Sequence, residues 1–131
     1  MMQIKHIHHV AILTDNYELS KHFYTETLGF KIIAETYRAE RDSYKLDLAI
    51  NGIYQIELFS FPDYRERGSY PESKGLRHLA FTVNDVEASA AFLKTIITLK
   101  SHRVSSPLWY LGVSAFTLIM SPFSCAFFNK G

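Results

Sequence analysis

The feature that most constrains this chain is an internal repeat. Residues 8–13 read HHVAIL and residues 77–82 read RHLAFT, so in both stretches a histidine precedes alternating small and large apolar residues. Both stretches continue with an Asp/Asn pair, a Glu, a Ser and a Phe at the same offsets from the histidine. Because repetition at a fixed spacing defines an architecture, we predict two copies of one module. Each copy should open with a strand that carries a histidine, His9 in the first and His78 in the second.

The first module is expected to span residues 4–60 in the order strand, helix and three strands. Asp15 or Asn16 can cap the helix at its start, and Gly29 can end it. Asn51-Gly52 is a strong signal for a tight hairpin turn. Alternating and β-branched apolar residues predict the strands. The expected segments are a strand at 4–13, a helix ending at Leu28, and strands at 30–37, 44–50 and 53–59.

The second module is expected to span residues 75–131, after a linker at 61–74 that contains Pro, Gly and several charges. A strand at 76–83 should precede a helix capped by Asn84 or Asp85. After about residue 98 the pattern is atypical, and short strands are expected near 109–113, 115–120 and 125–128. The whole chain is then one domain of the α+β class, built from two βαβββ modules.

Composition excludes several classes of protein. The net charge of +1 provides no basic field for nucleic acid. No run of about eighteen apolar residues is present that would span a membrane, and the N-terminus lacks the apolar region of a signal peptide. The one cysteine, Cys125, cannot form a disulfide within the chain, which fits a reducing compartment. We therefore expect a cytoplasmic enzyme or binding protein.

Three residues are candidates for a metal site: His9, Glu57 and His78. The two histidines occupy equivalent positions in the two modules, and Glu57 interrupts an apolar strand between Ile56 and Leu58. Two imidazoles and a carboxylate are suitable ligands for Zn, Ni, Mn or Fe(II). Residues on strands would hold such a site rigidly.

Structural explanations compete with this metal site. The chain has six histidines, so two at repeat positions can be a coincidence. Glu57 can simply face water on one side of an antiparallel sheet. His8 should point to the opposite face from His9, because side chains alternate along a strand.

Substrate contacts are less well indicated by the sequence. Arg38, Arg41 and Lys45 can meet an anionic group, or they can form a solvated charged turn. Trp109 and Tyr110 can wall a pocket or pack in the core.

Six stretches of the sequence carry a family resemblance: residues 8–12, 23–24, 28–30, 51–52, 56–59 and 75–81. Taken together, they resemble the vicinal oxygen chelate superfamily. This superfamily includes glyoxalase I, fosfomycin and bleomycin resistance proteins, and extradiol dioxygenases, and the chain is most similar to small bacterial lactoylglutathione-lyase-like proteins. The resemblance covers residues 4 to about 95. It implies paired βαβββ modules whose sheet curls around a divalent metal, with His9, Glu57 and His78 as ligands. It also implies a homodimer.

The chain departs from that family pattern near its end. The family's fourth ligand is a Glu on the last strand, and here Phe128 falls about where it would be. Residues 104–129 contain no Asp or Glu. If the missing Glu is the family's catalytic base, Glu57 would have to serve as both ligand and base.

Three functional hypotheses follow from the motifs and the altered tail. The first is a metal-dependent lyase or isomerase acting on a small substrate that chelates the metal through two oxygens. The second is a protein of the same fold that binds a small molecule without catalysis. The third is a non-functional relative with a replaced or frame-altered tail.

Overall fold

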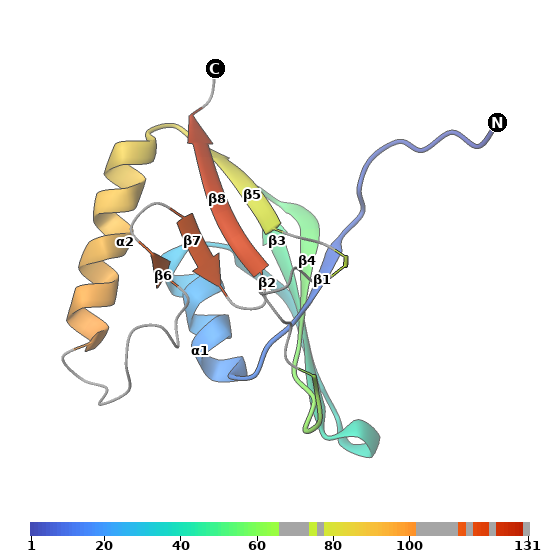
Figure 1. Ribbon diagram of the computed structural model, residues 1–131. Coiled ribbons are helices and arrows are strands. Elements are labelled where there is room, and N and C mark those ends of the chain that lie inside the picture. The colour runs from blue at the N-terminus through green and yellow to red at the C-terminus, as the bar shows by residue number, and fades with distance from the viewer. Residues whose placement is uncertain (66–73, 76–77, 102–112, 115–116, 121–122, 130–131) are drawn as a thin grey trace. The chain divides into compact units, whose positions relative to one another are not determined.

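The computed structural model describes the chain except for residues 66–73, 76–77, 102–112, 115–116, 121–122 and 130–131 (Figure 1). For His78 and for the described residues from 97 onward, only the backbone is described. The chain forms two compact units, Met1–Arg65 and Glu66–Gly131.

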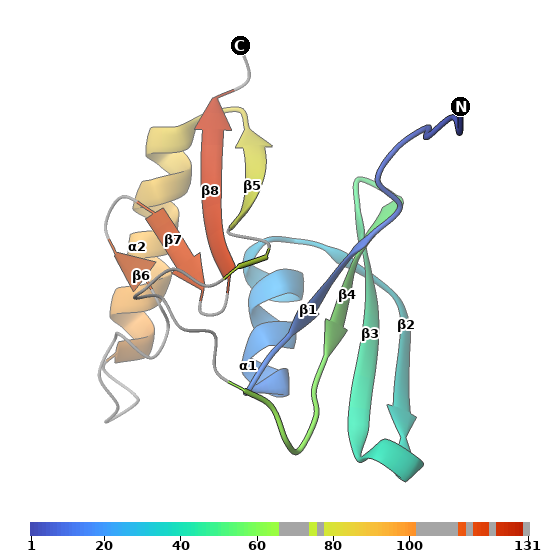
Figure 2. The same cartoon turned by 45° about the vertical axis from the view of Figure 1, so that its right-hand side comes forward.

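The first unit is a four-stranded mixed sheet with one helix. The sheet order is β1-β4-β3-β2, with β1 parallel to β4 and the other pairs antiparallel (Figure 2). A short π-helix continues α1, and a 3-10 turn joins β2 to β3. The elements are β1 (Val10–Leu13), α1 (Tyr17–His22), the π-helix (Phe23–Thr27), β2 (Lys31–Arg38), the 3-10 turn (Ala39–Arg41), β3 (Ser43–Ile50) and β4 (Ile53–Phe59).

The second unit repeats this arrangement. Its sheet order is β5-β8-β7-β6, and its first strand is again parallel to its last. The prediction of an α+β fold built from two βαβββ modules is therefore confirmed. Strand predictions that fall on residues 104–112 lie outside the described part of the chain. The elements are β5 (His78–Val83), α2 (Val86–Ser101), β6 (Val113–Ser114), β7 (Thr117–Met120) and β8 (Phe123–Asn129).

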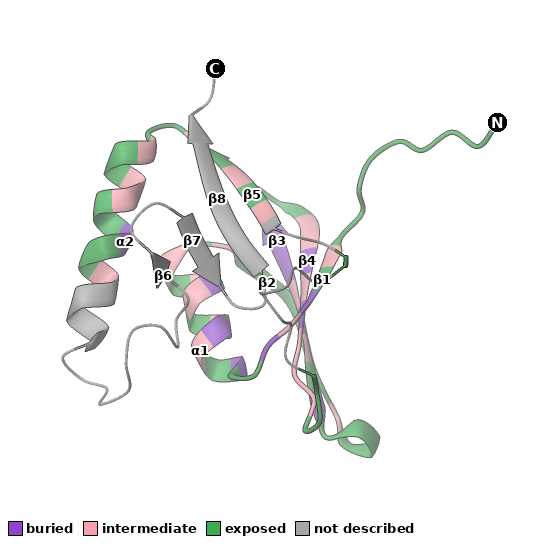
Figure 3. Ribbon diagram, in the orientation of Figure 1, coloured by how far each residue is buried: buried purple, intermediate pink, exposed green. Residues whose placement is uncertain are grey.

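The core of the first unit lies on one face of its sheet. Leu46 and Leu48 of β3 and Ile56 and Leu58 of β4 are at most 1% exposed, and α1 contacts β4. Their positions alternate along each strand, so they share a face. Figure 3 shows the buried residues gathered on these strands and on α1. The residues between them consequently lie on the opposite face, which carries the polar side chains described below.

Local signals in the sequence predicted the caps and turns of the first unit correctly. The Asn16 side chain accepts a hydrogen bond from the backbone N–H of Leu19 at 3.0 Å and caps α1. Gly29 has φ of 75° after the helical segment, where a residue without Cβ is favoured. Asn51 and Gly52 both have positive φ, 51° and 79°, as a type I′ hairpin requires.

The first strand is shorter than the sequence predicted. We expected it to begin at Ile4, but β1 begins at Val10, which pairs with Ile56 of β4. The register between β3 and β4 shifts just before Ile56, so Gln55 is an extra residue in β4. Such a bulge interrupts the ladder and ends regular pairing. His9 therefore precedes the strand.

No helix in the described part of the chain is long and apolar enough to cross a membrane.

Candidate functional site

Glu57 lies on the face of the first sheet that is opposite the apolar core. Its neighbours Ile56 and Leu58 fill the core, so the alternation of β4 directs Glu57 the other way. Asp47 of β3 is its cross-strand partner and shares that face. The Glu57 side chain is only 12% exposed because it is surrounded by polar partners. Glu57 is therefore neither a core residue nor a freely solvated one.

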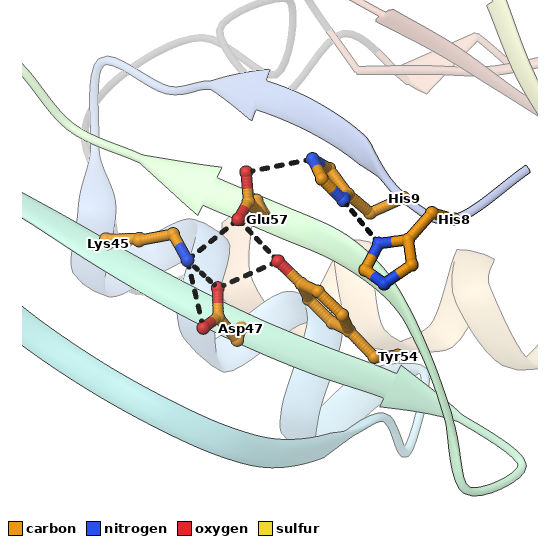
Figure 4. Close-up of polar contacts among 6 residues, drawn as sticks. All are labelled: His8, His9, Lys45, Asp47, Tyr54 and Glu57. Atoms are coloured by element: carbon orange, nitrogen blue, oxygen red, sulfur yellow. Dashed lines mark hydrogen bonds and ion pairs between the residues drawn. The ribbon is translucent and has the colours of Figure 1, made fainter.

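His9 and Glu57 lie next to each other. Glu57 pairs in register with Ala11, two residues after His9. The His9 Nε2 atom is 3.3 Å from Glu57 Oε2, and the His9 side chain is 37% exposed (Figure 4). Two of the three predicted ligands are thus brought together by the parallel pairing of β1 with β4.

The second oxygen of Glu57 is held by two further side chains. Lys45 Nζ is 2.7 Å from Glu57 Oε1, and it also contacts Asp47 Oδ1 at 2.8 Å. The Tyr54 hydroxyl donates to Glu57 Oε1 and contacts Asp47 Oδ1 at 3.2 Å (Figure 4). Lys45, for which the sequence left open an anion contact or a solvated turn, instead places its ammonium between two carboxylates of its own sheet.

Tyr54 reaches Glu57 because of the bulge in β4. In a regular strand, residues three apart point to opposite faces. The extra residue Gln55 reverses the alternation, so that Tyr54 pairs with Ala49 and turns to the Glu57 face. The Tyr54 ring also stacks on His9, with ring centroids 5.4 Å apart. Alternation along the strand gave no signal for the contact between Tyr54 and Glu57. The pairing of Asp47 with Glu57, in contrast, could have been predicted from the register of the hairpin.

The network favours an ionised Glu57. Burial by itself raises the pKa of the Glu57 carboxyl, but hydrogen bonds from Lys45 and Tyr54 more than offset this and lower the pKa below its ordinary value. Hydrogen bonds to Asp47 and Glu57 raise the pKa of the Lys45 ammonium. Burial, followed by the hydrogen bond to Glu57, raises the pKa of the Tyr54 hydroxyl. A carboxylate beside an ammonium and a neutral phenol is the stable state.

The expected orientation of His8 was wrong. Its Nδ1 atom lies 2.8 Å from His9 Nδ1, and its ring meets Tyr54 edge-on at 5.2 Å. The expectation required a strand through this segment, but β1 begins only at Val10. Without strand geometry, side chains of adjacent residues need not alternate.

The third predicted ligand, His78, is the first residue of β5 in the second unit. Its side chain lies outside the described part of the structure. Among the described side chains, no group of three or more His, Cys, Asp or Glu residues is arranged to hold a metal. The complete ligand set therefore stays a prediction.

The register of the second unit identifies the counterpart of Glu57. In the first unit Ala11 pairs with Glu57, and in the second unit the equivalent Ala80 pairs with Ala126. Family resemblance had pointed to the region of Phe128, which instead pairs with Thr82. An alanine, which has no ligating atom in its side chain, thus occupies the position of the carboxylate in the second module.

Comparison with known proteins agrees with this architecture. The family model described as the Glyoxalase/Bleomycin resistance protein/Dioxygenase superfamily matches residues 6–96. The chain belongs to this superfamily. The uncharacterized protein YwkD of Bacillus subtilis (strain 168) is 62% identical to this superfamily member over 86 residues, which are 66% of this chain and 67% of YwkD.

Solved structures also resemble this superfamily member. A glyoxalase family protein from Enterococcus faecalis shares 46% identity with a TM-score of 0.65, over 72% of this chain and 74% of that one. The trypanothione-dependent glyoxalase I of Leishmania major has a TM-score of 0.60 over 96% of this chain and 87% of its own, and at 18% identity it shows the fold alone. TnmS3, an antibiotic binding protein from Streptomyces sp. CB03234, has 25% identity and a TM-score of 0.51 over 73% of this chain and 74% of that one.

Two residues of the first unit carry donor atoms of the kind that divalent metals bind. His9 presents Nε2 and Glu57 presents Oε2 on one face, and imidazole nitrogen with carboxylate oxygen is a common donor set for Zn, Ni, Mn and Fe. Lys45 and Tyr54 occupy the other oxygen of Glu57 and fix its orientation, as outer partners of metal ligands do. The pair is therefore suited to provide two adjacent ligands.

Proposed function

We propose that this superfamily member is a divalent-metal-dependent enzyme of the glyoxalase type, a lyase or isomerase. Its substrate would be a small molecule that presents two neighbouring oxygens, and its ligands would be His9, Glu57 and His78. The observation that carries this proposal is the 3.3 Å approach of His9 Nε2 to Glu57 Oε2 on the face opposite the core. The superfamily and the repeat position of His78 support it.

In this proposal the protein side chains have distinct roles. Lys45 and Tyr54 hold Glu57 in one orientation and keep it ionised, so that Oε2 is available to a ligand or to a proton. Glu57 would also take the proton that leaves the substrate carbon, because no Asp or Glu occurs in residues 104–129 to act as a second carboxylate. Since Lys45 and Tyr54 occupy Oε1, Oε2 would serve as ligand and as base in turn. A bound divalent ion would polarise the substrate oxygens.

A second function, binding of a small molecule without catalysis, is favoured by one observation. Ala126 occupies the register position that Glu57 has in the first module. A site with fewer carboxylates has fewer groups that can ligate a metal or move a proton. The likeness to the antibiotic binding protein TnmS3 supports this alternative.

The two functions are separated by the metal content of the protein. The chain would be purified without a metal-affinity tag, beside His9→Ala, Glu57→Gln and His78→Ala variants and a control, His22→Ala, that removes an exposed histidine of α1. We expect roughly one divalent ion per chain in the wild type and the control, and much less in the three variants. Hemithioacetal and catechol-like substrates would then be screened.

No metal in the wild type, even after soaking at micromolar concentrations, would overturn the enzyme proposal and leave the binding protein. Metal that survives in all three variants would show that a different site holds it. We also propose a cytoplasmic homodimer, in keeping with the family resemblance; sedimentation analysis of the purified chain tests the oligomeric state.

A further inference from the structure

A second polar site lies on the same face of the first sheet as Glu57. Arg38 ends β2 and pairs across the strands with Ser43, while Thr36 pairs with Lys45. Because cross-strand partners share a face and side chains alternate, Arg38, Ser43 and Lys45 all lie on the Glu57 face.

The Arg38 guanidinium lies against aromatic rings. Its central carbon is 5.1 Å from the ring centroid of Phe59 and 5.6 Å from that of Phe61. The guanidinium of Arg41 lies 4.8 Å from the centroid of Phe61, and the two phenylalanine rings are nearly parallel at 6.0 Å. Two guanidinium groups therefore lie over the ring pair of Phe59 and Phe61. This stacking holds the planar Arg38 guanidinium in one position.

Three buried polar atoms at this point have no hydrogen-bond partner in the described part of the chain. Arg38 Nε and Nη2 are buried, and neither has a hydrogen-bond partner among the residues that the structure describes. Opposite Arg38, Ser43 is 0% exposed, and its Oγ is likewise buried without a partner in the described part of the chain. Buried polar groups are nearly always hydrogen-bonded, so two such residues paired across neighbouring strands indicate a missing partner.

We propose that Arg38 and Ser43 bind the oxyanion end, a carboxylate or a phosphate, of the small molecule that this protein acts on. A guanidinium offers parallel N–H donors that match two oxygens of such a group, and the Ser43 hydroxyl adds a third donor. Arg41, which lies over the Phe61 ring, contributes a second positive charge beside Arg38. A neutral ligand would leave the charge of Arg38 without a counter-ion.

The distance between Arg38 and the His9–Glu57 pair indicates how long the substrate is. This part of the inference rests on the proposed function. Phe59 lies two residues after Glu57, about 7 Å along the strand. A molecule whose oxygens meet His9 and Glu57 would need only a few bonds to place an anionic end at Arg38. The substrate class is thus a short molecule with two neighbouring oxygens at one end and an oxyanion at the other.

The test measures binding of inorganic phosphate and of acetate to the full chain by calorimetry. Ionic strength is held constant with chloride, and the titrations are made before and after a chelator removes divalent metal. The variants are Arg38→Gln, Arg38→Lys and Ser43→Ala. The matched control is Lys31→Gln, which removes an exposed positive charge at the other end of β2.

We expect saturable binding of at least one anion to the wild type and to the Lys31 control, and roughly tenfold weaker binding or none in Arg38→Gln. Arg38→Lys should be intermediate, because an ammonium lacks the planar fork. If acetate binds more tightly, the oxyanion of the substrate is assigned as a carboxylate. If inorganic phosphate binds more tightly, it is assigned as a phosphate. Circular dichroism checks that each variant folds; if Arg38→Gln does not, Ser43→Ala and Arg38→Lys decide.

Absence of saturable binding in the wild type would overturn the inference. So would equal binding in Arg38→Gln, or an equal loss in the Lys31 control. Since the titration is also made without metal, anion binding that persists in a chain that never binds metal would sustain this site while removing the proposed enzyme.

Discussion

His9 Nε2 and Glu57 Oε2 approach to 3.3 Å although 47 residues separate them in the chain. The parallel pairing of β1 with β4 produces this approach, and Lys45 and Tyr54 hold the remaining oxygen of Glu57. The central feature of the first module is therefore the Glu57 carboxylate. Lys45 and Tyr54 bind its Oε1 atom, and His9 lies beside its Oε2 atom.

Tyr54→Phe should weaken the hold on Glu57 without disturbing the stacking on His9. The hydroxyl bonds to Glu57 and Asp47 are lost, which should cost about 1 kcal/mol in free energy of unfolding. If Glu57 is a metal ligand, metal affinity should also fall by roughly tenfold. Urea denaturation and metal titration measure the two effects.

The matched control for Tyr54 is Tyr37→Phe. It removes a hydroxyl that bonds to Asp42 in an exposed part of β2, away from Glu57. This control should leave metal affinity unchanged. Equal metal affinity in wild type and Tyr54→Phe would show that the hydrogen bond from Tyr54 to Glu57 does not affect metal binding.

Glu35 should make stability depend on pH. Hydrogen bonds from Lys21 and Tyr17 lower the pKa of its carboxyl below the ordinary value of 4.5, although burial opposes them. Since the folded pKa is the lower one, this stabilisation is present above pH 4.5 and is lost as pH falls through the folded pKa. Glu35→Gln should therefore reduce the free energy of unfolding at pH 7 by at most about 1 kcal/mol, because the pair is partly exposed.

The measurement is urea denaturation of wild type and Glu35→Gln at pH 7 and at pH 3, with Asp63→Asn as a control that removes an exposed carboxylate. The difference between wild type and Glu35→Gln should shrink at the lower pH. A difference that stayed constant would assign the effect to packing of the side chain instead of its charge.

Gly52→Ala should destabilise the hairpin between β3 and β4. Gly52 has φ of 79°, and a Cβ there would meet nothing within 4 Å, so the cost is purely conformational. We expect a loss of about 1 kcal/mol in free energy of unfolding. Asn51→Gly, at the neighbouring residue with positive φ, should cost little, because glycine tolerates that conformation. Thermal unfolding of both variants compares them, and equal melting temperatures would contradict the turn assignment.

Leu48→Ala should damage the core beneath the site. Leu48 is 0% exposed, so truncation leaves a cavity and should cost about 3 kcal/mol. Ile53→Ala, at a residue of β4 that is 57% exposed, should cost less than about 0.5 kcal/mol. Guanidinium denaturation gives both values. Similar losses for the two variants would mean that the apolar face has been assigned wrongly.

The sequence by itself determined the modules and their local geometry. The repeat around His9 and His78 predicted two βαβββ units, and Asn16, Gly29 and Asn51-Gly52 predicted a cap, a helix end and a turn. These signals are local, because a side-chain cap or a positive φ depends on a few neighbouring residues. The alternation of Ile56, Glu57 and Leu58 also predicted that Glu57 faces away from the core.

Tertiary structure decided what surrounds Glu57. Tyr54 reaches it only because Gln55 is an extra residue in β4, and His8 lies beside His9 only because β1 begins at Val10. The register of β8 placed Ala126 at the position of Glu57. Each of these outcomes depends on which residues pair across strands that are distant in sequence. A shift of one residue in that pairing turns a side chain to the other face, and no local pattern in the chain specifies the shift.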